Sequence, residues 1–170
     1  MAAMVKNPTP LYIGEAYGLF NATNAGSLPA ASGKYGIDDG VWADLITLTK
    51  AKCGEKNIPV PSGTTMNGLC IWASVVAAKF LVHRNHRISS HVVRVVHKTG
   101  TAGADHYFAV AGDPGARIIC DITCSQFTGA PDYLVGTLDE VKGAANKIVA
   151  FGGTLYQAYQ AGAAYKEFVV

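Results

Sequence analysis

The chain has 170 residues, of which 49% are hydrophobic and 15% are charged, and its formal net charge at pH 7 is +2. This length fits one domain, so a single domain over residues 1–170 is expected, and the low charge excludes a disordered chain. Lys and Arg form no block, and no apolar run is long enough to span a bilayer. We therefore expect neither a nucleic-acid partner nor a membrane span.

The first part of the chain, residues 1–36, shows no clear hydrophobic period and holds several Gly, Pro, Ser and Asn residues, so we expect irregular structure there. Its first ten residues contain no long apolar region followed by a cleavage site, and no signal peptide is expected. The next segment predicts a helix that Asp38 or Asp39 caps. Its apolar residues fall on one helical face: Trp42, Leu45, Ile46 and Cys53.

The segment 67–83 follows a loop that contains Pro59 and Pro61, and it is apolar on nearly every side. A helix with that pattern is a buried helix. Cys70 would lie in the first turn of this helix, where a thiol is easily converted to the reactive thiolate.

Downstream, the chain changes to short segments rich in β-branched and aromatic residues, which predict strands over 91–100, 106–113 and 116–123. The turn sequence Asp-Pro-Gly at 113–115 joins the last two as a hairpin. Thr137 and Glu140 have the spacing of a capping box at the start of another helix, and the tail could add a strand or an apolar segment. Because helices precede strands, we expect an α+β fold with helices packed on an antiparallel sheet.

Four cysteines are too few for a disulfide scaffold in a chain of this length. Cys120 and Cys124 lie close in sequence, but no second pair and no histidine with matching spacing completes a zinc site. We therefore expect no metal and no other cofactor. Cys70 differs from the rest because a thiol at a helix start, beside an imidazole, can act as a nucleophile.

A cysteine nucleophile needs a histidine from elsewhere in the fold to act as its base. Of the five histidines, His83 and His86 lie at the far end of the nucleophile's own helix, roughly 20 Å away. His91 and His97 flank the first predicted strand, and each is possible. His106 is favoured because it opens a strand after a flexible loop, which places it at one end of the sheet.

The residue that orients the base is predicted to be Asp121. A hairpin turning at 113–115 roughly pairs position 106 with position 122, which places Asp121 or its neighbour beside His106. Side chains alternate along a strand, so a register shift of one residue decides whether Asp121 points at His106. Asp105 would face the opposite way. Taken singly, each of these residues also fits a structural role, and the alternative is a non-catalytic binding domain in which Cys70 is a core residue.

Roughly residues 66–127 resemble the papain-like bacterial toxin and effector deamidases, a family that includes the catalytic domain of Pasteurella multocida toxin and related Salmonella and Photorhabdus effectors. The shared pattern is a Cys at a helix start, a His that opens a strand, and an Asp 15 positions later within Asp-x-Thr-x-x-Gln-Phe. Here the pattern falls on Cys70, His106 and the segment 121–127. The rest of the chain carries no such resemblance.

The resemblance implies a papain-like fold and a Cys70–His106–Asp121 triad that converts Gln to Glu, or Asn to Asp, in a target protein through a thioester. The oxyanion would need two donors, and the backbone N–H of Cys70 is one. Candidates for the second are Asn67 and Gln126.

The partner implied is a protein of a host cell or a rival bacterium, with a cognate immunity protein as a second partner. The chain would be part of a larger toxin, or would leave the producing cell through a specialised secretion system, and would act in the target cell's cytosol.

Two further expectations concern chemistry at the same site. The same triad could serve a papain-like cysteine protease or a transglutaminase instead of a deamidase. Cys124, just past the Asp121 strand, is the one thiol with a plausible path to Cys70, and a disulfide between them would switch the enzyme off outside a cell. The alternative is that Cys124 only packs beside the cleft.

Overall fold

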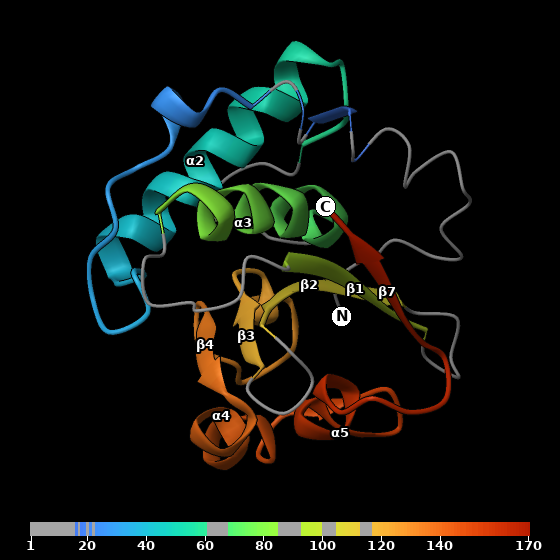
Figure 1. The fold of residues 1–170 in the computed structure, drawn as a ribbon. Coiled ribbons are helices and arrows are strands. Elements are labelled where there is room, and N and C mark those ends of the chain that lie inside the picture. The colour runs from blue at the N-terminus through green and yellow to red at the C-terminus, as the bar shows by residue number, and fades with distance from the viewer. Residues whose placement is uncertain are drawn as a thin grey trace.

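The structure, a computed structural model, describes residues 16, 18, 19, 21, 23–60, 68–84, 93–99, 105–112 and 117–170. In this part of the chain the elements form three layers: two long helices, an antiparallel sheet and two shorter helices (Figure 1). The fold is therefore mixed α+β with helices on an antiparallel sheet, as the sequence predicts.

The first layer holds the two long helices, α2 (Asp39–Glu55) and α3 (Cys70–Arg84). Asp38 caps α2, because its carboxylate accepts a hydrogen bond of 2.9 Å from the backbone N–H of Val41. α3 lies between α2 and the sheet (Figure 1). Every residue of α3 from its start to Leu81 is buried except Lys79. The buried helix predicted over 67–83 is confirmed over the residues described.

The middle layer is a five-stranded sheet in the order β4-β3-β2-β1-β7, and all neighbouring strands in it are antiparallel. The three strands predicted from the sequence are present, in shortened form, and the tail adds a further strand. The strands are β1 (Val93–Thr99), β2 (Asp105–Ala111), β3 (Ile118–Asp121), β4 (Leu134–Thr137) and β7 (Tyr165–Val169).

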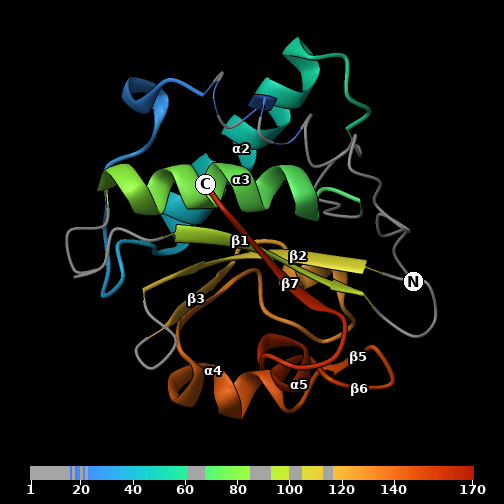
Figure 2. The same cartoon turned by 45° about the vertical axis from the view of Figure 1, so that its right-hand side comes forward.

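The third layer covers the face of the sheet opposite α3 (Figure 2). It consists of α4 (Leu138–Ala145) and α5 (Leu155–Tyr159), with a small hairpin of β5 (Val149–Ala150) and β6 (Gly153–Thr154) between them. The capping box predicted from the sequence is confirmed at the start of α4. There the Thr137 side chain accepts from the backbone N–H of Glu140, and the Glu140 side chain accepts from the backbone N–H of Thr137.

The central strand β2 is buried on both faces along its whole length. Tyr107 and Ala109 belong to the core cluster formed with α3, whereas Phe108 and Val110 belong to the cluster on the α4 and α5 side. This alternation follows from the two-residue period of a strand. Any polar side chain on β2 is consequently removed from water and must find its partners within the protein.

The N-terminal prediction is only partly right. Ala16, Gly18, Leu19 and Asn21 are helical, where irregular structure was expected over 1–36, and residues 1–15 lie outside the described part. One turn of 3-10 helix follows at Ala25–Ser27, and a second lies later in the chain at Cys124–Gln126. Among the described residues, no helix has the length and apolar character needed to cross a membrane.

Candidate active site

Cys70 is the first residue of α3, and its side chain is fully buried. The first N–H groups of a helix have no acceptor within the helix. In α3 the backbone N–H of Ala73 bonds to the carbonyl of Leu69 at 2.9 Å, which leaves the N–H groups of the first turn outside the helical ladder. Their partial positive charge favours an anion at this point, as a thiolate or an oxyanion requires. The predicted place of Cys70 at a helix start is confirmed.

The pairing of β2 with β3 brings His106 and Asp121 together. Ala109 lies opposite Cys120, and Ala111 lies opposite Ile118. Continued along the hairpin, this register puts position 106 opposite 123 rather than opposite 122, so the predicted register is wrong by one residue. The difference decides the site, because the observed register places Asp121 on the same face of the sheet as His106.

The carboxylate of Asp121 accepts three hydrogen bonds and donates none. His106 Nε2 lies 2.6 Å from Asp121 Oδ2, the hydroxyl of Tyr159 donates to the same oxygen at 2.6 Å, and the backbone N–H of Thr123 donates to Oδ1 at 3.1 Å. Since an ionised carboxylate only accepts, Nε2 must carry the proton in the pair with His106. The other ring nitrogen, Nδ1, has the amide nitrogen of Gln126 3.2 Å away and is the atom through which the ring would exchange a proton with a thiol.

Aromatic rings enclose the imidazole of His106 on the side away from α3. Phe127 packs edge-on against it with ring centroids 4.9 Å apart, while Phe108 lies at 5.9 Å and Phe151 at 6.5 Å. Both His106 and Asp121 are almost completely inaccessible to solvent. An ion pair in such a dry environment interacts more strongly than it would in water.

Cys70, at the start of α3, is one of the groups that change the pKa of the His106 imidazole. Burial is the largest single influence on the imidazole and lowers its pKa, but the charge and hydrogen bond of Asp121, followed by the hydrogen bond and charge of Cys70, raise the pKa to about 10. The site therefore favours an imidazolium at His106. Burial raises the pKa values of three thiols, that of Cys53 to about 11, and Asp121 adds to the rise at Cys120 and Cys124.

The Asp-x-Thr-x-x-Gln-Phe segment wraps around His106, and each of its named residues has a role there. Thr123 holds Asp121 through its backbone N–H, and Phe127 packs against the ring. The amide nitrogen of Gln126 lies 3.0 Å from the carbonyl of Thr123 and 3.2 Å from His106 Nδ1. Because this nitrogen already contacts Thr123 and His106, the role of Gln126 as the second oxyanion donor stays a prediction.

Neither of the other two described histidines, His83 and His97, belongs to this arrangement. His97 lies on the other face of the sheet, beside Asp105 rather than Asp121. His83 is exposed near the end of α3. His86, His91 and Asn67 fall outside the described residues, so the role of Asn67 as a second oxyanion donor stays a prediction.

All four cysteines are free. Cys70 belongs to the core cluster on the α3 face of the sheet, whereas Cys124 belongs to the cluster on the opposite face. The thiol of Cys124 donates to the carbonyl of Pro131 at 3.2 Å. A Cys70–Cys124 disulfide is therefore not formed in the structure, and the alternative that Cys124 only packs beside the cleft stays a prediction.

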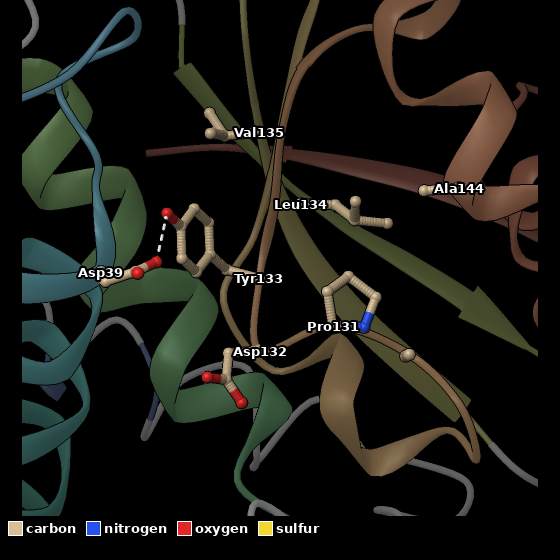
Figure 3. A pocket seen from close by; sticks show the side chains of 8 residues that line it. Asp39, Pro131, Asp132, Tyr133, Leu134, Val135 and Ala144 are labelled. Carbon is tan, nitrogen blue, oxygen red and sulfur yellow. Dashed lines mark hydrogen bonds between the residues drawn. The ribbon is translucent and has the colours of Figure 1, made fainter.

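A groove of about 690 Å³, separate from Cys70, His106 and Asp121, lies between the start of α2 and the segment before β4 (Figure 3). The hydroxyl of Tyr133 donates to Asp39 across it at 2.9 Å, and Pro131 and Asp132 line its rim. None of the three predicted triad residues contributes to its lining. The groove thus marks a surface feature rather than the site of the proposed chemistry.

Sequence reasoning missed Tyr159 and Phe151, both of which contribute to the site from the third layer. Tyr159 is 38 positions from Asp121 in the chain and reaches it only because α5 covers that face of the sheet. No spacing or pattern around Tyr159 indicates this contact, since a tyrosine in an apolar segment is usually interpreted as a residue of the hydrophobic core.

No known protein family, curated protein or solved structure matches the chain. Among the described residues, no group of three or more His, Cys, Asp or Glu side chains is arranged to hold a metal ion. What this site does must therefore be inferred from its own residues.

Proposed function

We propose that the chain is a bacterial toxin or effector that deamidates a Gln or Asn side chain of a target protein, on a papain-like fold, with Cys70, His106 and Asp121 as its triad. One observation carries the proposal. A buried imidazole is hydrogen-bonded at 2.6 Å to a buried carboxylate, and a cysteine at a helix start acts on the same ring. This is the combination that cysteine nucleophiles require. The resemblance of residues 66–127 to the deamidase family supports the choice of substrate.

In the proposed reaction the thiolate of Cys70 attacks the carbon of the side-chain amide, and the carbonyl oxygen becomes an oxyanion. The backbone N–H of Cys70 and the side-chain amide of Gln126 would donate to that oxygen. His106 then gives its Nδ1 proton to the nitrogen, the C–N bond breaks, and ammonia leaves a thioester behind. Water, deprotonated by His106, attacks the thioester. The new acid and the thiol of Cys70 are released, and Asp121 holds the ring throughout.

The enzyme would bring this reaction to a host cell or a rival bacterium, where its partner is the target protein and, in the producing cell, an immunity protein. All four cysteines are free, which suits a protein that works in a reducing cytosol. A specialised secretion system would deliver the protein from the producing cell to the cytosol of the target cell.

The proposal is tested by mass spectrometry of proteins from cells that express the wild type or Cys70→Ala. Deamidation leaves the target chain intact and replaces an NH group by oxygen at one Gln or Asn. A cut chain would indicate a protease instead, and an amine adduct or a cross-link would indicate a transglutaminase. Cys53→Ser is the matched control, because it removes a buried thiol on α2 that is not among the groups acting on His106. If no target changes in a Cys70-dependent way, the proposal is wrong.

A further inference from the structure

A second polar cluster lies on the opposite side of β2 from His106. Asp105 and Tyr107 flank His106 in sequence and therefore project toward the α3 face of the sheet. On the neighbouring strand, His97 pairs with Tyr107, and the two rings stack with centroids 4.6 Å apart and planes 12° apart. His97 Nε2 lies 3.6 Å from Asp105 Oδ1, which is too far for a hydrogen bond.

His97 Nε2 lies 3.2 Å from the hydroxyl of Thr99, but the polar side-chain atoms of Asp105 and Tyr107 have no hydrogen-bond partner among the described residues. Both carboxylate oxygens of Asp105 and the hydroxyl of Tyr107 are buried without a hydrogen bond in the described structure, and the two residues are 0% and 1% exposed. Leaving such groups unsatisfied away from water costs several kcal/mol for a carboxylate and about 1–3 kcal/mol for a hydroxyl. Folded proteins retain few groups of this kind, and those that remain are explained by strain, a catalytic role, or a bound water or ion.

The cluster is next to the proposed nucleophile. Tyr107 belongs to the same core cluster as Cys70. Burial, then the charge of Cys70, then that of Asp105 raise the pKa of Tyr107, so the phenol stays protonated. A ligand held by Asp105 and Tyr107 would therefore lie within reach of a group bonded to Cys70.

No positive charge of the described chain neutralises Asp105. Burial, the main influence, lowers the pKa of His97, the charge of Lys166 lowers it as well, and Asp105 only partly opposes them, which leaves the ring neutral at pH 7. Lys166 faces His97 from β7, but its side chain is exposed, and no ion pair joins it to Asp105 in the residues that the structure describes. The cluster offers hydrogen-bond acceptors and one uncompensated negative charge.

We propose that Asp105, Tyr107 and His97 form a subsite beside Cys70 that binds a primary ammonium or a guanidinium group. These cations supply the N–H donors and the positive charge that the cluster lacks. The group would be carried on a Lys or Arg side chain near the target amide, or would belong to a small free amine. The inference rests on the proposed role of Cys70 as nucleophile, and it names the class of substrate that this nucleophile prefers.

The test uses two small thiosulfonates of similar length that differ in charge, aminoethyl methanethiosulfonate against the neutral propyl methanethiosulfonate. The Cys70 thiolate attacks the reagent's sulfur, a mixed disulfide forms, and methanesulfinate leaves, so the rate reports access to Cys70 without any protein substrate. Rates are followed by mass spectrometry of the Cys70 peptide and divided by those of free cysteine. We expect the wild type to favour the cationic reagent, and Asp105→Asn to reduce that preference by about tenfold or more, since the subsite is buried. Tyr107→Phe should reduce it less.

Two controls separate a binding role from a structural one. Asp44→Asn removes an exposed carboxylate on α2, outside the cluster, and should leave the preference for the cationic reagent unchanged. Urea unfolding of Asp105→Asn should show equal or greater stability than the wild type, because the variant buries no unpaired charge. A large loss of stability would mean that Asp105 has a structural partner, and it would overturn the proposal.

A competition experiment with free cations shows where the bound cation comes from. Protection of Cys70 against the neutral reagent by methylammonium or guanidinium indicates a free amine, whereas preference for the tethered cation without such protection indicates a Lys or Arg of the substrate. If Cys70 reacts but Asp105→Asn leaves the charge preference unchanged, the subsite does not exist, and the proposed deamidase stands. If Cys70 reacts no faster than Cys53 with the neutral reagent, the nucleophile itself is wrong.

Discussion

Asp121→Asn is the substitution to which the proposed site should be most sensitive. All three groups around the carboxylate are donors: His106 Nε2–H, the Tyr159 hydroxyl and the Thr123 backbone N–H. An asparagine of the same shape must place its NH₂ toward at least one of them, so a donor faces a donor in either orientation. The imidazolium of His106 also loses the negative charge that stabilises it.

The size of the effect follows from burial. Removing one partner of a buried ion pair costs about 3–5 kcal/mol of the free energy of unfolding, because the remaining charge is left without compensation. His106 and Asp121 are both 1% exposed or less, so no solvent moderates this loss. A domain stable by about 5–15 kcal/mol would still fold. Activity should fall by about 10⁴, the loss seen when the orienting carboxylate of a triad becomes an amide.

Two measurements check the prediction on the same samples, urea unfolding and the pH dependence of iodoacetamide labelling at Cys70. In the variant, the unfolding midpoint should decrease, and labelling of Cys70 should require a higher pH because the imidazolium partner is weakened. Asp44→Asn, an exposed carboxylate, controls for loss of charge alone. The reasoning is refuted if Asp121→Asn unfolds within about 0.5 kcal/mol of the wild type, the range of surface changes, with an unchanged labelling profile.

Three other outcomes follow from the geometry. Tyr159→Phe removes one charged hydrogen bond to Asp121 and should lower the free energy of unfolding by about 1.5–3 kcal/mol in urea titrations; a change under 0.5 kcal/mol would argue against this contact. The pKa of His106 is raised from 6.5 to about 10, so its contribution to the free energy of unfolding is complete below pH 6.5 and is lost toward pH 10. The difference in free energy of unfolding between the wild type and His106→Gln should therefore vanish toward pH 10. Finally, thiol counting on protein purified without reductant should give four free thiols, with Cys70 labelling first; two free thiols in the wild type and three in Cys124→Ser would revive the disulfide switch.

Much of the architecture could be predicted from short-range signals. The apolar run after residue 67 specified a buried helix and placed Cys70 at its start, and the spacing of Thr137 and Glu140 specified the cap of α4. These features depend on hydrogen bonds and side-chain periods within a few residues of one another, so the local sequence contains the information needed. The alternation along β2 similarly predicted that Asp105 and His106 face opposite sides.

The contacts that make the site depend on tertiary structure. The sequence placed the turn near 113–115, but packing on both faces of the sheet fixed the β2–β3 register, and one residue of shift would have turned Asp121 away from His106. Tyr159 reaches Asp121 only because α5 folds back over the sheet. The sequence could therefore name the proposed nucleophile and its proposed base. Tertiary structure decided the rest. Three donors hold the carboxylate of Asp121, whereas that of Asp105 has no hydrogen bond in the described part of the chain, because these partners come from segments that meet only in the folded chain.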